Sequence, residues 1–166
     1  MSTEAGGLIR LQFSRQYDWS SGDIAWFTQG RFSHVDALLP NGTLTGARSD
    51  RIQGIPPGVR NRPAGYAKWK YVSVMTMGVT RDQERAFYDF IASQVGKPYD
   101  GWDIWTIATG GRDRDWRADD AWICSELVTV AIEIALVFKE ARVSASKIAP
   151  NPLYFACSVC GFRELP

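Results

Sequence analysis

The first half of the chain alternates apolar and polar residues with a period of two, which is the spacing of half-buried β-strands. This pattern predicts strands at residues 8–13 and 71–77 and a shorter strand at 23–27. Between them, residues 50–70 contain three prolines and several glycines. That segment is predicted to be a loop.

A hairpin is predicted around the pair Asn41-Gly42, because this dipeptide is a strong turn signal when strand-like residues flank it. Residues 34–39 and 43–47 would then be neighbouring antiparallel strands. The turn could be a two-residue loop or a bulged one, and the choice sets which side chains share a face.

From Thr80 the apolar positions recur at helical spacing. Thr80 followed by Gln83 and Glu84 is a helix-start pattern, since a threonine side chain can cap the first turn. Gly96 and Pro98 are expected to end this helix.

A second helix is predicted from about Trp122 to about Phe138, with Asp119 and Asp120 as capping carboxylates. The segment before it has no clean period. The proline-containing tail, residues 150–166, is predicted to be a loop followed by a terminal strand. Strands first, then two helices and a last strand indicate an α+β fold.

The composition changes this picture little. A chain of 166 residues is long enough for one core, so a single domain is expected over residues 1–166. With 19 basic and 18 acidic residues and no block of one sign, nucleic acid is not an expected partner. No integral membrane segment is expected, because Glu126, Glu133 and Lys139 interrupt the apolar run after Cys124. Three cysteines favour a reducing, cytoplasmic location, and the composition predicts no oligomeric state.

Cys124 lies at the predicted start of the second helix, where unpaired N–H groups and the helix dipole lower a thiol pKa. The only histidine, His34, lies in the predicted hairpin, where a strand could hold its ring against that helix. The two residues could form a nucleophile and a general base. They could equally be a small core residue and a hydrogen-bonded structural histidine.

Several motifs in the chain resemble those of a known family. They are "SSGDIAWF", "RFSHVDALLPNGTLTGA", "VGKPYDGWDIW", "WICSELVTVAI" and "APNPLY". In this order they resemble the circularly permuted papain-fold cysteine hydrolases, the YiiX-type branch of the NlpC superfamily, over about residues 22–154. The histidine precedes the cysteine, as the permutation requires.

The resemblance implies a permuted papain-like fold, in which a small antiparallel barrel-like sheet packs on helices and the nucleophile begins a helix. It implies that Cys124 is the nucleophile, that His34 is the general base, and that Tyr99 lies near the oxyanion. A tyrosine hydroxyl there could donate to the tetrahedral intermediate. The alternative for Tyr99 is a packed ring with its hydroxyl in water.

The resemblance also implies a reaction, the hydrolysis of amide bonds through a thioester. The expected substrate is a peptide, such as a cell-wall peptide, or a small acyl-bearing molecule. Two alternatives remain open: lipid acyl transfer of the lecithin:retinol acyltransferase-like type, and a binding module whose Cys-His pair is vestigial.

One position departs from the family pattern, because Gly46 stands where these hydrolases usually carry the polar group that orients the histidine. Polar side chains that could face His34 instead depend on the register: they are Thr45 and Ser49 for a two-residue turn, Arg48 and Asp50 for a bulged one, and Asp36 in either case. Whichever group serves is expected to accept the Nδ1 proton of the ring.

Cys157 and Cys160 have the spacing of half a zinc site or of a redox motif. A zinc site normally needs four ligands, and too few further candidates remain. Neither a metal nor another cofactor is therefore expected.

Overall fold

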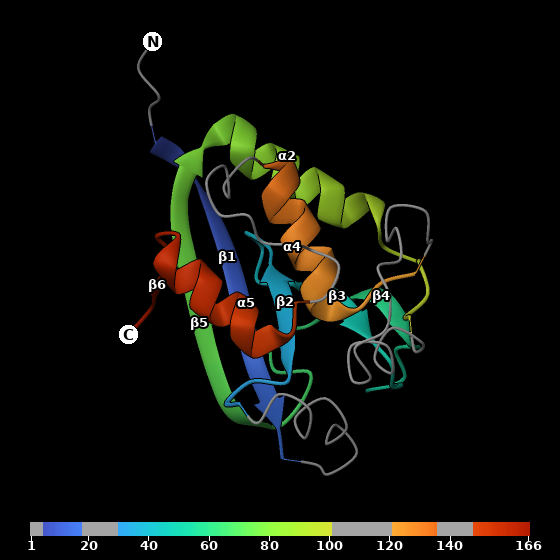
Figure 1. The fold of residues 1–166 in the computed structure, drawn as a ribbon. Helices are drawn as coiled ribbons and strands as arrows, with labels where there is room; N and C mark the ends of the chain where they lie inside the picture. Colours follow the sequence, from blue (N-terminus) through green and yellow to red (C-terminus); the bar gives the residue numbers. More distant parts are fainter. Residues whose placement is uncertain (1–4, 18–29, 101–120, 136–147) are drawn as a thin grey trace, which may run out of the picture.

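The computed structural model describes residues 5–17, 30–100, 121–135 and 148–166. The strands are β1 (Ala5–Gln16), β2 (His34–Leu38), β3 (Leu44–Arg48), β4 (Gly58–Arg62), β5 (Trp69–Thr80) and β6 (Arg163–Glu164), and the helices are α2 (Arg81–Ser93), α4 (Cys124–Ile134) and α5 (Pro150–Val159). They form an antiparallel sheet in the order β4-β3-β2-β1-β5-β6, packed against the three helices (Figure 1). The α+β class is confirmed. The sheet is open rather than barrel-like, and the predicted strand at 23–27 lies outside the described residues.

The sheet is built around the long antiparallel pair β1 and β5. Alternation along β1 puts Ile9, Leu11 and Phe13 on one face, where all three are fully buried. The core forms where this face meets α2 and α4, which contribute Phe87 and Leu127. Burying such side chains stabilises the fold by about 1.5–3 kcal/mol each.

The predicted hairpin is confirmed, and its turn is the bulged kind. Gly42 N–H donates to Leu39 O at 2.9 Å, and Leu39 N–H donates to Thr43 O at 2.8 Å, which leaves three residues in the loop. Gly42 adopts the left-handed conformation (φ 84°) that this turn requires. The pairing of Ala37 with Thr45 follows from that loop.

The predicted loop at residues 50–70 is wrong over Gly58–Arg62, which is β4. This strand pairs with all of β3, and its Val59 also exchanges hydrogen bonds of 2.9 Å with Gly96 N–H and Lys97 O. The prolines lie outside the strand, so none removes an N–H from its ladder. Val59 is its one apolar side chain, and a single apolar residue carries no alternation for the sequence to display.

The tail was also predicted incorrectly, because residues 150–159 form helix α5 instead of a loop. Pro150 and Pro152 lie in its first turn, where a missing N–H removes no helical hydrogen bond. Leu153 and Cys157, four residues apart, bury one face of the helix. The terminal strand is confirmed as the short β6.

Helix α4 begins at Cys124, and its N-cap is Ile123, not either of the predicted aspartates, which lie outside the described part of the chain. All its residues from Cys124 to Ile132 are buried, so α4 is the central helix of the core. No helix within the described ranges is long and apolar enough to cross a membrane.

The predicted start of α2 is confirmed as a capping box. Gln83 N–H donates to Thr80 Oγ1 at 3.2 Å, and Thr80 N–H donates to Gln83 Oε1 at 3.0 Å. We expect Thr80→Ala to lower the free energy of unfolding by about 1 kcal/mol, because it leaves first-turn N–H groups without a partner. Urea unfolding followed by circular dichroism measures this.

The matched control for the capping box is Arg85→Ala on the same helix. The Arg85 side chain is 70% exposed and lies 3.6 Å from Asp82 Oδ1, so its removal should change the stability by less than about 0.5 kcal/mol. Equal losses for the two variants would contradict a specific capping contribution.

Candidate active site

The start of α4 is fixed by the residues just before it. Trp122 N–H donates to Pro98 O and Asp100 N–H donates to Trp122 O, both at 3.1 Å, so the segment around Tyr99 runs beside Trp122. The Trp122 indole N–H also donates to Gln94 Oε1 at 3.0 Å. These contacts bring the Gly-Lys-Pro-Tyr motif next to Cys124.

The Cys124 thiol lies at the positive end of the α4 dipole. Ile123 makes no side-chain capping bond, so no cap competes for the first N–H groups of the helix. Cys124 is 3% exposed. An anion at this position is therefore stabilised by backbone dipoles rather than by water.

His34 begins β2 and lies beside this thiol. Its Nε2 is 2.9 Å from Asp36 Oδ1, and Cys124 is near enough to raise the pKa of the ring through charge and hydrogen bonding, for which Nδ1 is the remaining nitrogen. From the sequence, the orienting group was predicted to face Nδ1. In the structure it faces Nε2, so the ring is held through the other nitrogen. The β2–β3 pairs are Ala37–Thr45 and Leu38–Leu44, and Val35 N–H, beyond their end, donates to the Cys124 sulfur.

The strand that carries His34 is anchored from α5. Asn151 accepts the Phe32 N–H at 2.8 Å through Oδ1 and donates to Phe32 O at 2.6 Å through Nδ2. A side chain that holds both backbone groups of one residue restrains the entry to β2. The sequence motif "APNPLY" contains this asparagine, but nothing local showed what it would bind.

Cys124 and His34 shift each other's pKa. Burial raises the pKa of Cys124, but attraction to His34 and hydrogen bonds from His34 and from the Val35 N–H outweigh burial, so this pKa lies below its usual range. Burial lowers the pKa of His34, but attraction to Asp36 and Cys124 prevails and raises it to about 9. Each charge favours the other, so the thiolate–imidazolium form is more populated here than for an isolated cysteine and histidine.

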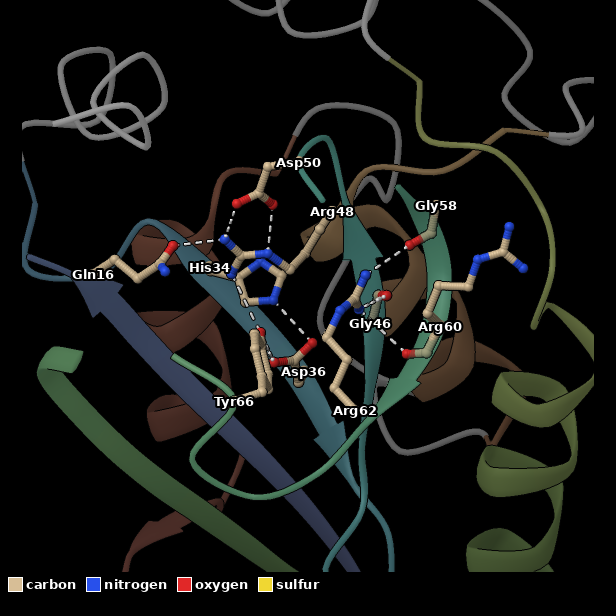
Figure 2. A network of polar contacts seen from close by, with 10 residues as sticks. All are labelled: Gln16, His34, Asp36, Gly46, Arg48, Asp50, Gly58, Arg60, Arg62 and Tyr66. Carbon is tan, nitrogen blue, oxygen red and sulfur yellow. Dashed lines mark hydrogen bonds and ion pairs between the residues drawn. The ribbon is translucent and has the colours of Figure 1, made fainter. Parts of the chain in front are cut away.

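The Asp36 carboxylate is fully buried and bound at both ends (Figure 2). Tyr66 Oη donates to Oδ2 at 2.8 Å while Oδ1 meets His34. Burial raises the pKa of Asp36, but attraction and hydrogen bonding from His34, with smaller contributions from Tyr66 and Arg62, lower it below the usual range. Tyr66 and Arg62 were not predicted as site residues, because they come from the segment interpreted as loop.

The other candidates for orienting His34 have different partners. The bulged register puts Arg48 on the His34 face, where its guanidinium donates to Asp50 at 2.7 and 2.8 Å. Thr45 donates to Asn61 Oδ1 at 2.7 Å on the opposite face, and Ser49 is exposed. Of the predicted candidates, only Asp36 has a hydrogen bond to the imidazole in the structure.

Tyr99 is half-buried and lines a pocket of about 450 Å³ together with Ser49, Pro57, Arg60, Gly96 and Pro98. Burial, followed by the nearby Cys124 charge, raises the pKa of Tyr99. Its hydroxyl therefore stays protonated at neutral pH and can donate a hydrogen bond. Tyr99 thus lines the pocket and lies near enough to Cys124 for the two to interact electrostatically.

Cys157 and Cys160 lie apart from this site. Cys157 is fully buried in α5, where burial raises its thiol pKa, and Cys160 follows the helix end. Within the ranges that the structure covers, no three His, Cys, Asp or Glu side chains come together as a metal site.

The comparisons with known proteins identify a fold. No family model matches the chain, and no curated protein does. Among solved structures, the chain is similar to metalloprotein yiiX from Escherichia coli O157:H7, with a TM-score of 0.59 and 15% sequence identity over 98% of this chain and 97% of that one. The chain therefore has a YiiX-like fold.

Proposed function

We propose that this chain is a cysteine hydrolase of the permuted papain-like type, with Cys124 as nucleophile and His34 as general acid and base. The observation that carries the proposal is the contact between a helix-start thiol and the chain's only imidazole, with their pKa values displaced in opposite directions. Such displaced pairs concentrate at catalytic sites.

The first half of the reaction forms a thioester. The Cys124 thiolate attacks the carbonyl carbon of an amide, a C–S bond forms, and the carbonyl oxygen becomes an oxyanion. Tyr99 Oη and the Cys124 N–H donate to that oxygen. The His34 imidazolium then gives its proton to the nitrogen, the C–N bond breaks and the amine leaves.

The second half returns the enzyme to its starting state. Neutral His34 removes a proton from water, and the resulting hydroxide adds to the thioester carbon. The C–S bond breaks, the carboxylic acid leaves, and the thiolate and imidazolium are restored.

The pocket beside Tyr99 favours a peptide substrate over a lipid acyl chain. Arg60 and Ser49 line it, and a hydrocarbon chain would gain nothing by desolvating a guanidinium. A peptide or small amide can use these groups for hydrogen bonds. The lipid acyltransferase alternative has no such support among the described residues. The binding-module alternative rested on Gly46, whose missing side chain is replaced by the Asp36 contact with His34.

The similar yiiX protein is a metalloprotein, which raises the question of a metal at the corresponding place in this chain. In the described part of this chain, the residues beside Cys124 do not fit a metal, because Asp36 and Cys124 both engage His34 and no group of three or more His, Cys, Asp or Glu side chains is arranged to hold one. The proposed reaction therefore runs through protein groups.

The state of the thiol can be tested by brief alkylation. We expect iodoacetamide at pH 7 to modify Cys124 faster than Cys157 and Cys160, because the pKa is lowered for the first and raised for the other two. Mass spectrometry of the peptides measures the order, and Cys124→Ala identifies the signal. Equal modification of all three thiols would contradict a perturbed thiolate.

The catalytic pair can be tested with a panel of peptide amide, small amide and fatty acyl ester donors. Turnover should require Cys124 and fall by ~10²- to 10⁴-fold in His34→Ala, the range for loss of general-base help. Because the imidazolium is lost as the pH rises through about 9, kcat/KM should decline there. Ester-only turnover would favour the lipid alternative. No turnover above Cys124→Ala, with equal ligand binding by both forms, would favour the binding module.

Tyr99→Phe removes one hydroxyl and keeps the ring. If that hydroxyl donates to the oxyanion, kcat should fall by roughly 10²- to 10³-fold with little change in KM. Steady-state kinetics separates the two constants. An unchanged kcat would assign Tyr99 to packing alone, and Tyr88→Phe, which removes a hydroxyl that donates to Leu38 O at 2.9 Å, is the control for loss of a tyrosine hydroxyl.

A further inference from the structure

We propose that Asp36 is the positioning residue that orients His34, and that Gly46 is the residue whose missing side chain makes room for it. This inference rests on the proposed function, since an orienting group matters only to a base that acts. It places the acid on β2, two residues from the histidine, instead of on β3, where the resembling hydrolases carry their polar group.

The space for the carboxylate comes from Gly46. Ala37–Thr45 is the last pair of the β2–β3 ladder, and the residues next to it, Asp36 and Gly46, lie in close contact. A Cβ atom at residue 46 would overlap Asp36 Oδ1, the same oxygen that contacts His34 Nε2, and would lie 3.1 Å from Asp36 Cγ. Any side chain at residue 46 would have to displace the carboxylate.

Backbone conformation does not explain this glycine. The left-handed glycines of the chain are Gly42, Gly54, Gly58, Gly65, Gly96 and Gly161 within the described residues, and Gly46 is not one of them. Its φ and ψ are open to other residues, as expected in a strand. The requirement for glycine at this position is therefore one of space.

The backbone of Gly46 helps to hold the same acid in place. Arg62, which is 1% exposed, donates from Nη1 to Gly46 O at 2.8 Å, and its positive charge lies near Asp36 (Figure 2). Tyr66 binds the second carboxylate oxygen. The carboxylate is thus held by two hydrogen bonds beside a positive charge, and this arrangement restricts the rotation of the imidazole.

If Asp36 positions His34, its removal should change the titration of His34, which the loss of a merely structural acid would not do. Asp36 is the largest influence that raises the pKa of His34, so Asp36→Asn should lower this pKa from about 9. Because the chain has one histidine, its imidazole NMR signals titrate without overlap. The alkaline limit of kcat/KM should move down with the titration, and kcat should fall by ~10²- to 10⁴-fold with KM little changed.

Two further variants separate position from charge and from folding. Gly46→Ala keeps the acid but displaces it, so it should lower the His34 pKa and kcat in the same direction, and its effect should not add to that of Asp36→Asn. Asp50→Asn removes a carboxylate whose hydrogen bonds go to Arg48, and should lower the His34 pKa far less than Asp36→Asn does. If Asp36→Asn does not fold, Gly46→Ala carries the same test.

The outcomes distinguish the two proposals. An unchanged His34 titration in Asp36→Asn, or in Gly46→Ala where only that variant folds, would overturn the positioning role whether or not the protein is a hydrolase. A lowered His34 pKa in a protein without turnover on any donor would support the Asp36 contact and overturn the hydrolase. A lowered pKa together with the kcat loss would support both.

Discussion

The buried contact between His34 and Asp36 is the interaction on which the candidate site depends. Two charged groups removed from water cost several kcal/mol each in desolvation, and their mutual attraction offsets this only if further hydrogen bonds complete the pair. Tyr66 supplies a hydrogen bond to Asp36, Cys124 contributes hydrogen bonding and charge to His34, and Arg62 adds a nearby positive charge. The cluster alternates positive and negative groups from Arg62 through Asp36 and His34 to Cys124, so removing one member leaves its neighbour as an uncompensated buried charge.

This arrangement links the chemistry of the site to the topology of the sheet. Asp36 and His34 come from β2, Gly46 from β3 and Arg62 from β4, and consecutive antiparallel pairing brings them together. The apolar side chains that alternate with them, such as Val35 and Ala37, belong to the core. One face of the same strands therefore packs against the helices, and the other carries the charged residues. Cys124, at the start of α4, belongs to the core and also lies beside His34.

The sequence alone predicted the elements whose structure depends on neighbouring residues. The Thr80 capping box and the Asn41-Gly42 turn each need only neighbouring residues, and both are confirmed. Strand β4 has no such signal, because its stability comes from pairing with β3 and from the backbone of residues 96 and 97. Helix α5 was missed because its prolines were interpreted as loop residues, although a first turn accepts them.

The candidate site was only partly predictable for a related reason. Cys124, His34 and Tyr99 lie in recognisable motifs, and the structure brings them close together. Asp36 faces His34 in either register, but the register decides which of the other candidates share that face, because one extra residue in the turn moves every side chain of β3 to the other face. Tyr66 and Arg62 have no local pattern at all, since their contacts cross 30 and 16 residues of chain, respectively.

The end of the β2–β3 ladder has a consequence for how such sites are dissected. Val35 N–H, which has no partner in that ladder, helps to lower the thiol pKa, and this donor belongs to the main chain. Alanine scanning leaves every amide in place, so a scan of this protein would assign the whole pKa shift to side chains and overlook the strand. Replacing the peptide bond before Val35 by an ester, through chemical ligation, is the kind of change that reaches this contribution, because an ester oxygen keeps the shape of the backbone and donates nothing.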